Sequence, residues 1–243
     1  MEIREITAKS ILNRSGIPGI TYCINPYTGC QHGCRYCYAD FMKRYSGHSE
    51  PWGKFVDVKI NSPYLLELQL RRSVKSEVLL SSVTDPYQPA EKRYGITRKC
   101  LEILLQYQFP VSILTKSDLI TRDIDILLKF DDISVGLTVT TDSEDIKKIF
   151  EPNSPSLKQR LNALKILYGE GIKTFAFIGP ILPMKVHKLV RMLQGLITYV
   201  HVDRMNYSNK VKDIYRKYNW EYYLSDEYFS HVYDVVGSSF NIN

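Results

Sequence analysis

Three cysteines that lie close together are the strongest chemical signal in this sequence. Cys30, Cys34 and Cys37 belong to the stretch NPYTGCQHGCRYCYAD (25–40), and His32 lies between the first two. Thiolates are good metal ligands, and three at this spacing can bind one metal centre together. The spacing therefore predicts a metal site within this stretch.

Zinc is one candidate for this site, with His32 or Cys23 as a fourth ligand. Zinc ligands usually come as two separated pairs, however. No second pair exists here, because Cys100 stands alone on a predicted helix face and Cys23 lies within a predicted strand. Buried free cysteines of this kind more often serve packing than metal binding.

A [4Fe-4S] cluster on Cys30, Cys34 and Cys37 is the second candidate. Such a cluster normally takes four thiolates. Three thiolates would leave one iron free to bind a small molecule, by the same logic that keeps one position open in a catalytic zinc site. From the residues alone both candidates stay open, because His32 could still complete a zinc site.

Length and composition limit the class of protein. The chain has 243 residues, of which 44% are hydrophobic, enough for one substantial core. It shows neither a signal peptide nor an apolar run long enough to span a membrane. We expect a cytoplasmic protein without disulfides and without a membrane partner. The net charge of +6 permits a polyanionic or acidic partner without requiring one.

Strand-like and helix-like patterns alternate along the chain. Six runs rich in β-branched residues occur at 19–25, 77–84, 110–116, 132–141, 172–179 and 198–205. Apolar stripes of helical spacing lie between most of them, as in 157–168 and 186–197. This alternation predicts an α/β protein built from parallel βα units. No Pro/Gly-rich linker divides the chain, so we expect a single domain over 1–243.

The strands have two different faces, which favours a barrel over a doubly wound sheet. In 132–141 the apolar positions alternate with the small or polar residues Ser134, Gly136, Thr138 and Thr140. A parallel sheet covered on both sides should be apolar on both faces. Six units are too few for a closed eightfold barrel, so we predict a partial (β/α)6 TIM-like barrel. In such a fold the chemistry lies after the carboxyl ends of the strands, where the cysteines are.

These residues resemble the radical S-adenosylmethionine (SAM) superfamily. The C-x3-C-x2-C spacing, with Tyr36 before the last cysteine, is that superfamily's pattern, and its members have a partial (β/α)6 barrel. Further segments resemble the spore photoproduct lyase-like group, whose label often suggests DNA repair; they lie at 9–39, 58–72, 81–104, 151–167 and 179–183. Membership implies a [4Fe-4S] cluster that an external electron donor reduces and that cleaves SAM to methionine and a 5′-deoxyadenosyl radical.

The resemblance also implies residues for the charged ends of SAM. Its ammonium would meet Ser82, Thr84 and Asp85, which stand where many members have Gly-Gly-Glu; alternatively, Thr84 and Asp85 only form a turn. Its carboxylate would meet Lys116. Arg160 is a second candidate for the carboxylate, because a cation near a helix start is disfavoured unless an anion lies nearby. The alternative for Arg160 is a solvated surface position.

For the nucleoside part of SAM, the resemblance implies a further set of residues. Thr138 and Thr140 lie on the predicted inner face and could reach the ribose hydroxyls. The adenine would rest near Tyr36, Ile178 and Gly179, with backbone of the sixth strand.

The chain departs from spore photoproduct lyase itself in one respect. That enzyme returns a hydrogen atom from a cysteine near the end of its second strand, and residues 80–85 contain no cysteine. Thymine-dimer repair by that route is therefore not expected. We expect a radical SAM enzyme of the lyase-like group, with nucleic acid somewhat favoured as substrate. The alternatives are a glycyl-radical activase that acts on a partner protein, and a non-catalytic redox sensor or metal-binding module.

The C-terminal part has its own pattern. We place the barrel core at about 18–206 and a helical, aromatic extension at 207–243. Residues 206–229 interleave basic and aromatic side chains, which can bind nucleic acid. The other interpretation, which we favour, is an amphipathic cap that packs its aromatic side chains on the barrel and leaves its lysines in water.

Overall fold

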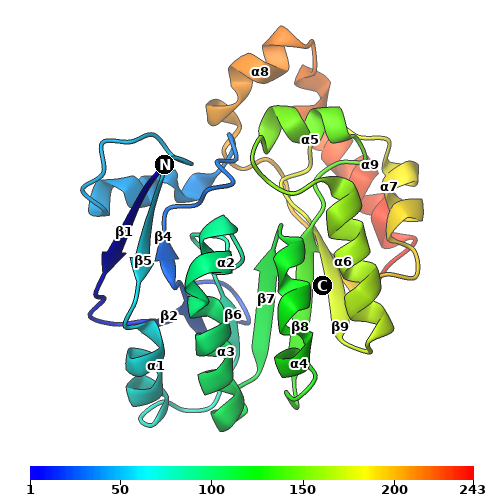
Figure 1. The fold of residues 1–243 in the computed structure, drawn as a ribbon. Coiled ribbons are helices and arrows are strands. Elements are labelled where there is room, and N and C mark those ends of the chain that lie inside the picture. The colour runs from blue at the N-terminus through cyan, green and yellow to red at the C-terminus, as the bar shows by residue number, and fades with distance from the viewer.

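The main sheet is an open, mostly parallel sheet with helices packed against it (Figure 1). The computed structural model describes residues 1–243. Strand order is β10-β9-β8-β7-β6-β3-β2, and only β2 is antiparallel to its neighbour. These strands are β2 (Leu12–Arg14), β3 (Tyr22–Ile24), β6 (Val78–Leu80), β7 (Val111–Thr115), β8 (Ile133–Thr138), β9 (Lys173–Ile178) and β10 (Tyr199–Val202).

All six predicted strands are present, each within its predicted run. The sheet does not close, because β2 and β10 are its two edges. This arrangement confirms the prediction of a partial (β/α)6 barrel. At the β10 edge the chain adds a short parallel bridge: the amide of Val200 donates to the carbonyl of Asn241 (2.9 Å) and the amide of Asn243 donates to the carbonyl of Val200 (2.9 Å).

Helices connect the strands and pack against the apolar face of the sheet (Figure 1). Sequence signals explain several ends: Ser156 and Gln159 form a capping box at the start of α6, and Gly95, with φ of 62°, ends α2. The elements are α1 (Ser62–Leu70), α2 (Pro89–Tyr94), α3 (Ile96–Tyr107), the 3-10 helix η2 (Asp118–Asp123), α4 (Ile124–Leu127), α5 (Glu144–Phe150), α6 (Leu157–Gly169) and α7 (Val186–Leu193).

The opposite face of the sheet is the lumen face of the barrel. The apolar side chains of β8, such as Val135 and Leu137, belong to the core against the helices. Gly136 faces the lumen and pairs with Phe175 of β9. A side chain at Gly136 would collide with the Phe175 ring, so the small residue makes room for a protein ring. His201 of β10 lies two residues after Tyr199, which pairs with Phe175, so it too is on the lumen face.

A small second sheet was not predicted from the sequence. It consists of β1 (Glu2–Ile6), β5 (Phe55–Lys59) and β4 (Tyr27–Thr28), with β5 between the other two. The 3-10 helix η1 (Tyr38–Tyr45) also belongs to this side of the molecule. Because β4 directly precedes the cysteines, the small sheet helps to fix the position of the loop that carries them.

The C-terminal part consists of short helices next to the carboxyl ends of the strands. They are η3 (Ser208–Lys210), α8 (Lys212–Lys217), η4 (Glu221–Leu224) and α9 (Asp226–Gly237). In Figure 1 α8 projects at the top, and α9 lies beside α7. None of the helices combines the length and the apolar character that crossing a membrane demands.

Candidate active site

The three cysteines lie on one loop that follows β4, near the carboxyl ends of the barrel strands. Cys30 and Cys34 are buried, Cys37 is partly buried, and all three are free thiols. Two tight turns shape the loop: the amide of Gly33 donates to the carbonyl of Cys30 (3.2 Å), and the amide of Cys37 donates to the carbonyl of Cys34 (3.1 Å). We call residues 29–37 the cysteine loop.

Residues 84–90 hold one side of the cysteine loop. The Gln88 side chain donates to the carbonyl of Gly29 (3.2 Å) and accepts from the amide of Gln31 (2.9 Å). The Gln31 side chain in turn accepts from the amide of Ala90 (2.5 Å). The Thr84 hydroxyl also donates to the carbonyl of Gly29 (2.6 Å). The TDPYQPAE stretch is therefore a clamp on the cysteine loop.

Asp85 is buried at the centre of this clamp, and several donors already surround it. Its carboxylate accepts from the Thr115 hydroxyl (2.6 Å), the Lys116 amide (2.8 Å) and the Tyr87 amide (2.9 Å). His32 Nε2 lies 3.2 Å away, although neither ring nitrogen makes a well-aligned hydrogen bond. Burial by itself would raise the pKa of Asp85, but His32 and these hydrogen bonds hold it well below its usual range. Asp85 thus has the partners of a structural residue.

Residues 150–153 hold the other side of the cysteine loop. The amide of Arg35 donates to the carbonyl of Phe150 (2.9 Å), and the amide of Asn153 donates to the carbonyl of His32 (3.4 Å). The Asn153 side chain also donates to the carbonyl of Gln31 (3.2 Å). Since the residues joined are more than 110 positions apart, this second clamp exists only in the folded protein.

A buried polar network lies next to the second clamp. Glu151 accepts from the hydroxyls of Tyr36 and Thr140 and forms an ion pair with Arg160. Arg160 also donates to the carbonyls of Thr138 (2.9 Å) and Pro155 (3.1 Å). Its side chain is fully buried, so the surface alternative for Arg160 is wrong. Most of its N–H groups have partners within the chain, which gives Arg160 a positioning role.

Lys116 is a cation near this network whose ammonium has no hydrogen-bond partner within the protein and can bind a ligand. Its ammonium lies 5.9 Å from the centre of the Tyr36 ring. Burial by itself would lower the pKa of Lys116, but Cys34 and Glu151 nearby raise it above its ordinary value. Lys116 therefore stays charged beside Tyr36, where it can meet an anionic ligand group.

Burial dominates the acidity of all three cysteine thiols. Burial raises the pKa of the Cys34 thiol to about 12, against the opposing effect of Lys116. Burial also raises the pKa of Cys30 and of Cys37. A metal centre bound by these thiols would therefore have to displace their protons. No three His, Cys, Asp or Glu side chains lie close enough together to bind a single metal ion. A [4Fe-4S] cluster does not require such a close group, because each thiolate binds a different iron.

The remaining residues predicted to bind SAM are spread more widely. The Ser82 amide donates to the Asn25 side chain (3.0 Å), and the Ser82 carbonyl accepts from the Tyr38 hydroxyl. Thr138 is buried on the lumen face. The Ile178 side chain lies in the core on the helix side, so only its backbone can face a lumen ligand. Gly179 lies close to Phe177 and Asp203, where any side chain would collide with the Phe177 ring.

The C-terminal extension covers the cysteine loop. Val211 and Tyr215 are buried in a cluster with Cys34, Tyr36, Phe150 and Leu182, and Trp220 and Tyr223 pack at its edge. This is the packing that the amphipathic-cap interpretation predicts. The cap shields Cys34 and Tyr36 from solvent.

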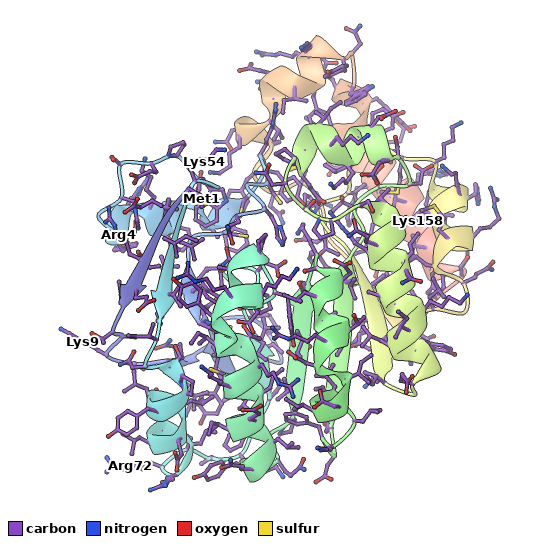
Figure 2. All side chains as sticks on the ribbon, in the orientation of Figure 1. Met1, Arg4, Lys9, Lys54, Arg72 and Lys158 are labelled. Atoms are coloured by element: carbon purple, nitrogen blue, oxygen red, sulfur yellow. The ribbon has the colours of Figure 1, made fainter.

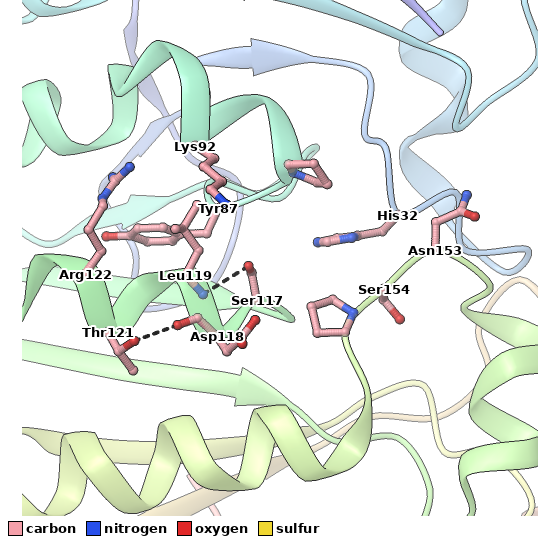
Figure 3. A pocket seen from close by; sticks show the side chains of 12 residues that line it. His32, Tyr87, Lys92, Ser117, Asp118, Leu119, Thr121, Arg122, Asn153 and Ser154 are labelled. Carbon is pink, nitrogen blue, oxygen red and sulfur yellow. Dashed lines mark hydrogen bonds between the residues drawn. The ribbon is translucent and has the colours of Figure 1, made fainter.

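A cavity of about 650 Å³ lies elsewhere, between α2, η2 and residues 153–155. In Figure 3, His32 and Asn153 lie on one side of it and Arg122 and Tyr87 on the other. Most of the residues that line it are polar, and neither the three cysteines nor any residue predicted to bind SAM is among them. It reaches the cysteine loop only through His32.

Sequence reasoning missed two functional positions, Glu151 and Gln88. For Glu151 a signal existed: a cation at the position of Arg160 called for a nearby anion, and Glu151 is that anion. For Gln88 there was none, because its partners Gly29 and Gln31 lie 57 or more positions away.

Comparison with known proteins identifies the family of this site. A model of the Radical SAM superfamily matches residues 24–194. Protein MJ0683 of Methanocaldococcus jannaschii is 45% identical over 183 residues, which cover 75% of this chain and 69% of that protein. Protein Rv2578c of Mycobacterium tuberculosis is 31% identical over 191 residues, 74% of this chain and 56% of that protein. A radical SAM Nalpha-GlyT isomerase of Pseudomonas phage M6 is 25% identical over 161 residues, 65% of this chain and 32% of that protein.

Solved structures show the same fold. A spore photoproduct lyase variant with bound AdoMet and dinucleoside spore photoproduct superposes with a TM-score of 0.69 at 17% identity, over 89% of this chain and 66% of that one. Streptococcus suis SuiB bound to its precursor peptide SuiA gives 0.56 at 16% identity, over 81% of this chain and 46% of that one. The chain is thus shorter than these proteins, and the fold is what it shares with them.

Proposed function

Because this chain belongs to the radical SAM superfamily, whose members are enzymes that use a [4Fe-4S] cluster and SAM, we propose that it cleaves SAM reductively and directs the resulting radical at a nucleic-acid substrate. One observation carries the first half of the proposal: Cys30, Cys34 and Cys37 share a loop that two clamps hold beside the charged ammonium of Lys116. The cluster, once bound and reduced, supplies the electron that splits SAM.

The chain's own residues then bind and orient SAM. Lys116 pairs with its carboxylate, since its ammonium makes no hydrogen bond within the protein and stays protonated. Thr138 and the strand ends offer oxygens to the remaining polar groups. Ser82, Thr84 and Asp85, in contrast, already have partners around the cysteine loop, so they act on SAM mainly by fixing that loop.

The cap over the cysteine loop has a role in this proposal. Val211 and Tyr215 cover Cys34 and Tyr36 with apolar surface. A reactive radical must be kept from water and from side reactions, and an apolar cover provides that exclusion.

One structural neighbour supports nucleic acid as the substrate class. The spore photoproduct lyase structure holds a dinucleoside spore photoproduct. SuiB, which binds a peptide, has the lower TM-score of the two structures. The chain lacks a cysteine in residues 80–85, so the proposed reaction differs from thymine-dimer repair through that thiol.

An anaerobic assay tests the first half-reaction. The cluster is reconstituted, dithionite and SAM are added, and 5′-deoxyadenosine is measured by chromatography. We expect it to form with the unaltered protein and to vanish in Cys34→Ala. The matched control is Cys100→Ala, because Cys100 is a buried core thiol outside the site. A protein that holds one zinc ion and releases no 5′-deoxyadenosine contradicts the proposal.

A further inference from the structure

Two segments far apart in the sequence meet beside the cysteine loop. Tyr38 of η1 stacks on Tyr207, with ring centres 5.8 Å apart and planes 18° apart. Asp40 of η1 forms an ion pair with Lys210. We call residues 38–45 and 207–218 together the rim surface. It starts one residue after Cys37, and Tyr38 donates to the carbonyl of Ser82, two residues after β6, so it borders the carboxyl ends of the barrel strands.

The rim surface exposes aromatic rings that the protein does not use for its core. Tyr45 is 78% exposed, and Tyr207 is 47% exposed. Tyr38 and Phe41 are also exposed, and Phe41 packs edge-on against Tyr45. These rings differ from Tyr215 of the same region, which is buried in the cap. The four rings form two contacting pairs, Tyr38 with Tyr207 and Phe41 with Tyr45, and exposed aromatic side chains gathered in this way mark a binding surface.

The rim surface is also basic. Its 20 residues contain six basic side chains, Lys43, Arg44, Lys210, Lys212, Arg216 and Lys217, and two acidic ones, Asp40 and Asp213. The whole chain has 32 basic and 26 acidic side chains, so most of its net positive charge comes from these two segments. Arg44 and Lys212 are exposed and make no ion pair, which leaves them available for a partner.

We propose that the rim surface binds single-stranded nucleic acid and leads it to the lumen, an inference that rests on the proposed function and names the form of its substrate. Exposed rings stack with unpaired bases, and lysines and arginines contact the phosphates. Duplex bases are already stacked on each other and cannot lie on Tyr45 or Tyr207. The combination of rings and cations therefore selects a single strand over a duplex.

The position of the rim surface supports this assignment. The end of the surface nearest the carboxyl ends of the barrel strands is Tyr38, which follows Cys37 and contacts Ser82, two residues after β6. A strand bound along η1 toward Tyr38 and Tyr207 would present one base at the lumen opening. An enzyme that acts on a base must first take that base out of a stack, and a single strand removes most of that cost.

Binding is tested by fluorescence anisotropy with labelled oligonucleotides of about 16 nucleotides, as DNA, as RNA and as the matched DNA duplex. The protein is the cluster-loaded full chain under anaerobic conditions, at salt between about 50 and 200 mM. We expect one or both single strands to bind more tightly than the duplex. Comparison of the DNA and RNA arms shows which sugar the surface prefers.

Two variants and two matched controls locate the site. Tyr45→Ala should weaken single-strand binding by roughly five-fold or more, the loss expected for one stacked base. Arg44→Ala should lower the slope of log affinity against log salt by about 0.7, the value for one phosphate contact on a single strand. Tyr64→Ala and Arg72→Ala are the controls: Tyr64 is 65% exposed on α1, and Arg72 lies at the end of the molecule opposite α8 (Figure 2).

Several results would overturn the inference. They are absence of single-strand binding at low salt, equal affinity for duplex and single strand, or equal losses in Tyr64→Ala and Tyr45→Ala. The release of 5′-deoxyadenosine by the unaltered protein is measured separately, without nucleic acid. This measurement distinguishes failure of the rim inference from failure of the proposed function. If SAM is cleaved and no strand binds, the radical chemistry stands and the rim inference is wrong.

Discussion

Glu151 and Arg160 form an ion pair in which both side chains are completely buried. Glu151 also accepts from the Tyr36 hydroxyl, so the pair connects α6 to the cysteine loop. Burying two charges away from water costs free energy unless each charge is paired and hydrogen-bonded, as both are here. The pair therefore makes the local structure sensitive to any change in either partner.

Removing one partner should destabilise the protein strongly. Arg160→Leu leaves Glu151 buried without its cation, and we expect a loss of about 3–5 kcal/mol in the free energy of unfolding. The measurement is urea denaturation followed by circular dichroism. The control is Arg216→Leu, because Arg216 pairs with Asp213 on the exposed surface and should cost less than about 1 kcal/mol. A loss in Arg160→Leu no larger than in the control would contradict this role.

The same pair predicts how stability depends on pH. Burial by itself would raise the pKa of Glu151, but Arg160 and Lys116 lower it from 4.5 to about 2. Since the pKa is lower in the folded state, the contribution of Glu151 is fully present above pH 4.5 and is lost as the pH falls through about 2. Urea midpoints measured from pH 5 down to pH 2 should fall less steeply in Glu151→Gln than in the unaltered protein. Parallel curves for the two proteins would refute the assignment.

Lys116→Ala tests the carboxylate contact with SAM. Loss of a charge-assisted hydrogen bond should raise the KM for SAM roughly ten-fold or more, while iron and sulfide content stay unchanged. Lys158→Ala is the control, because Lys158 is exposed on the outer surface of α6 (Figure 2). An unchanged KM in Lys116→Ala would remove Lys116 from the site, and loss of iron would show that it supports the cysteine loop instead.

Gln88→Leu tests the first clamp. The variant leaves the amide of Gln31 without its partner, at a cost of about 1–3 kcal/mol, and the carbonyl of Gly29 keeps only the Thr84 hydroxyl. We expect fewer iron atoms per chain after reconstitution and faster loss of iron to a chelator. Gln194→Leu is the control, since Gln194 is exposed after α7. Equal iron content and equal rates in the two variants would show that the clamp is dispensable.

Gly136→Ala tests the packing of the lumen face. The added methyl group would collide with the Phe175 ring, and overpacking of this kind costs about 1–3 kcal/mol. The melting temperature should fall in Gly136→Ala and recover partly in the double variant with Phe175→Leu. If the double variant is less stable than Gly136→Ala, the collision is not the cause.

The strands and the cysteines could be predicted because their signals are local. Six apolar runs, each bounded by turns, predicted the six strands, and the spacing of Cys30, Cys34 and Cys37 was enough to propose a cluster site. The small sheet was missed because β1 carries charges at three of its five positions and β4 has two residues, so neither shows a clear strand pattern.

The network behind the site could not be predicted, because its partners are distant in sequence. Tyr36 and Glu151 are 115 positions apart, and nothing in either segment points to the other. The position of Arg160 near a helix start correctly indicated a nearby anion. That anion is the carboxylate of Glu151. Asp85 was selected for its polarity; it proved to be held by four neighbouring groups of its own protein.

The order of the two clamps along the chain has a consequence for maturation of the enzyme. The cysteines and the first clamp lie within the first 90 residues, whereas the second clamp begins at Phe150. During synthesis from the N-terminus, the cysteines therefore leave the ribosome long before the segment that closes over them, and the cap follows later still. Iron and sulfide delivered in that interval would meet an open loop, and the later folding steps would then enclose the bound cluster.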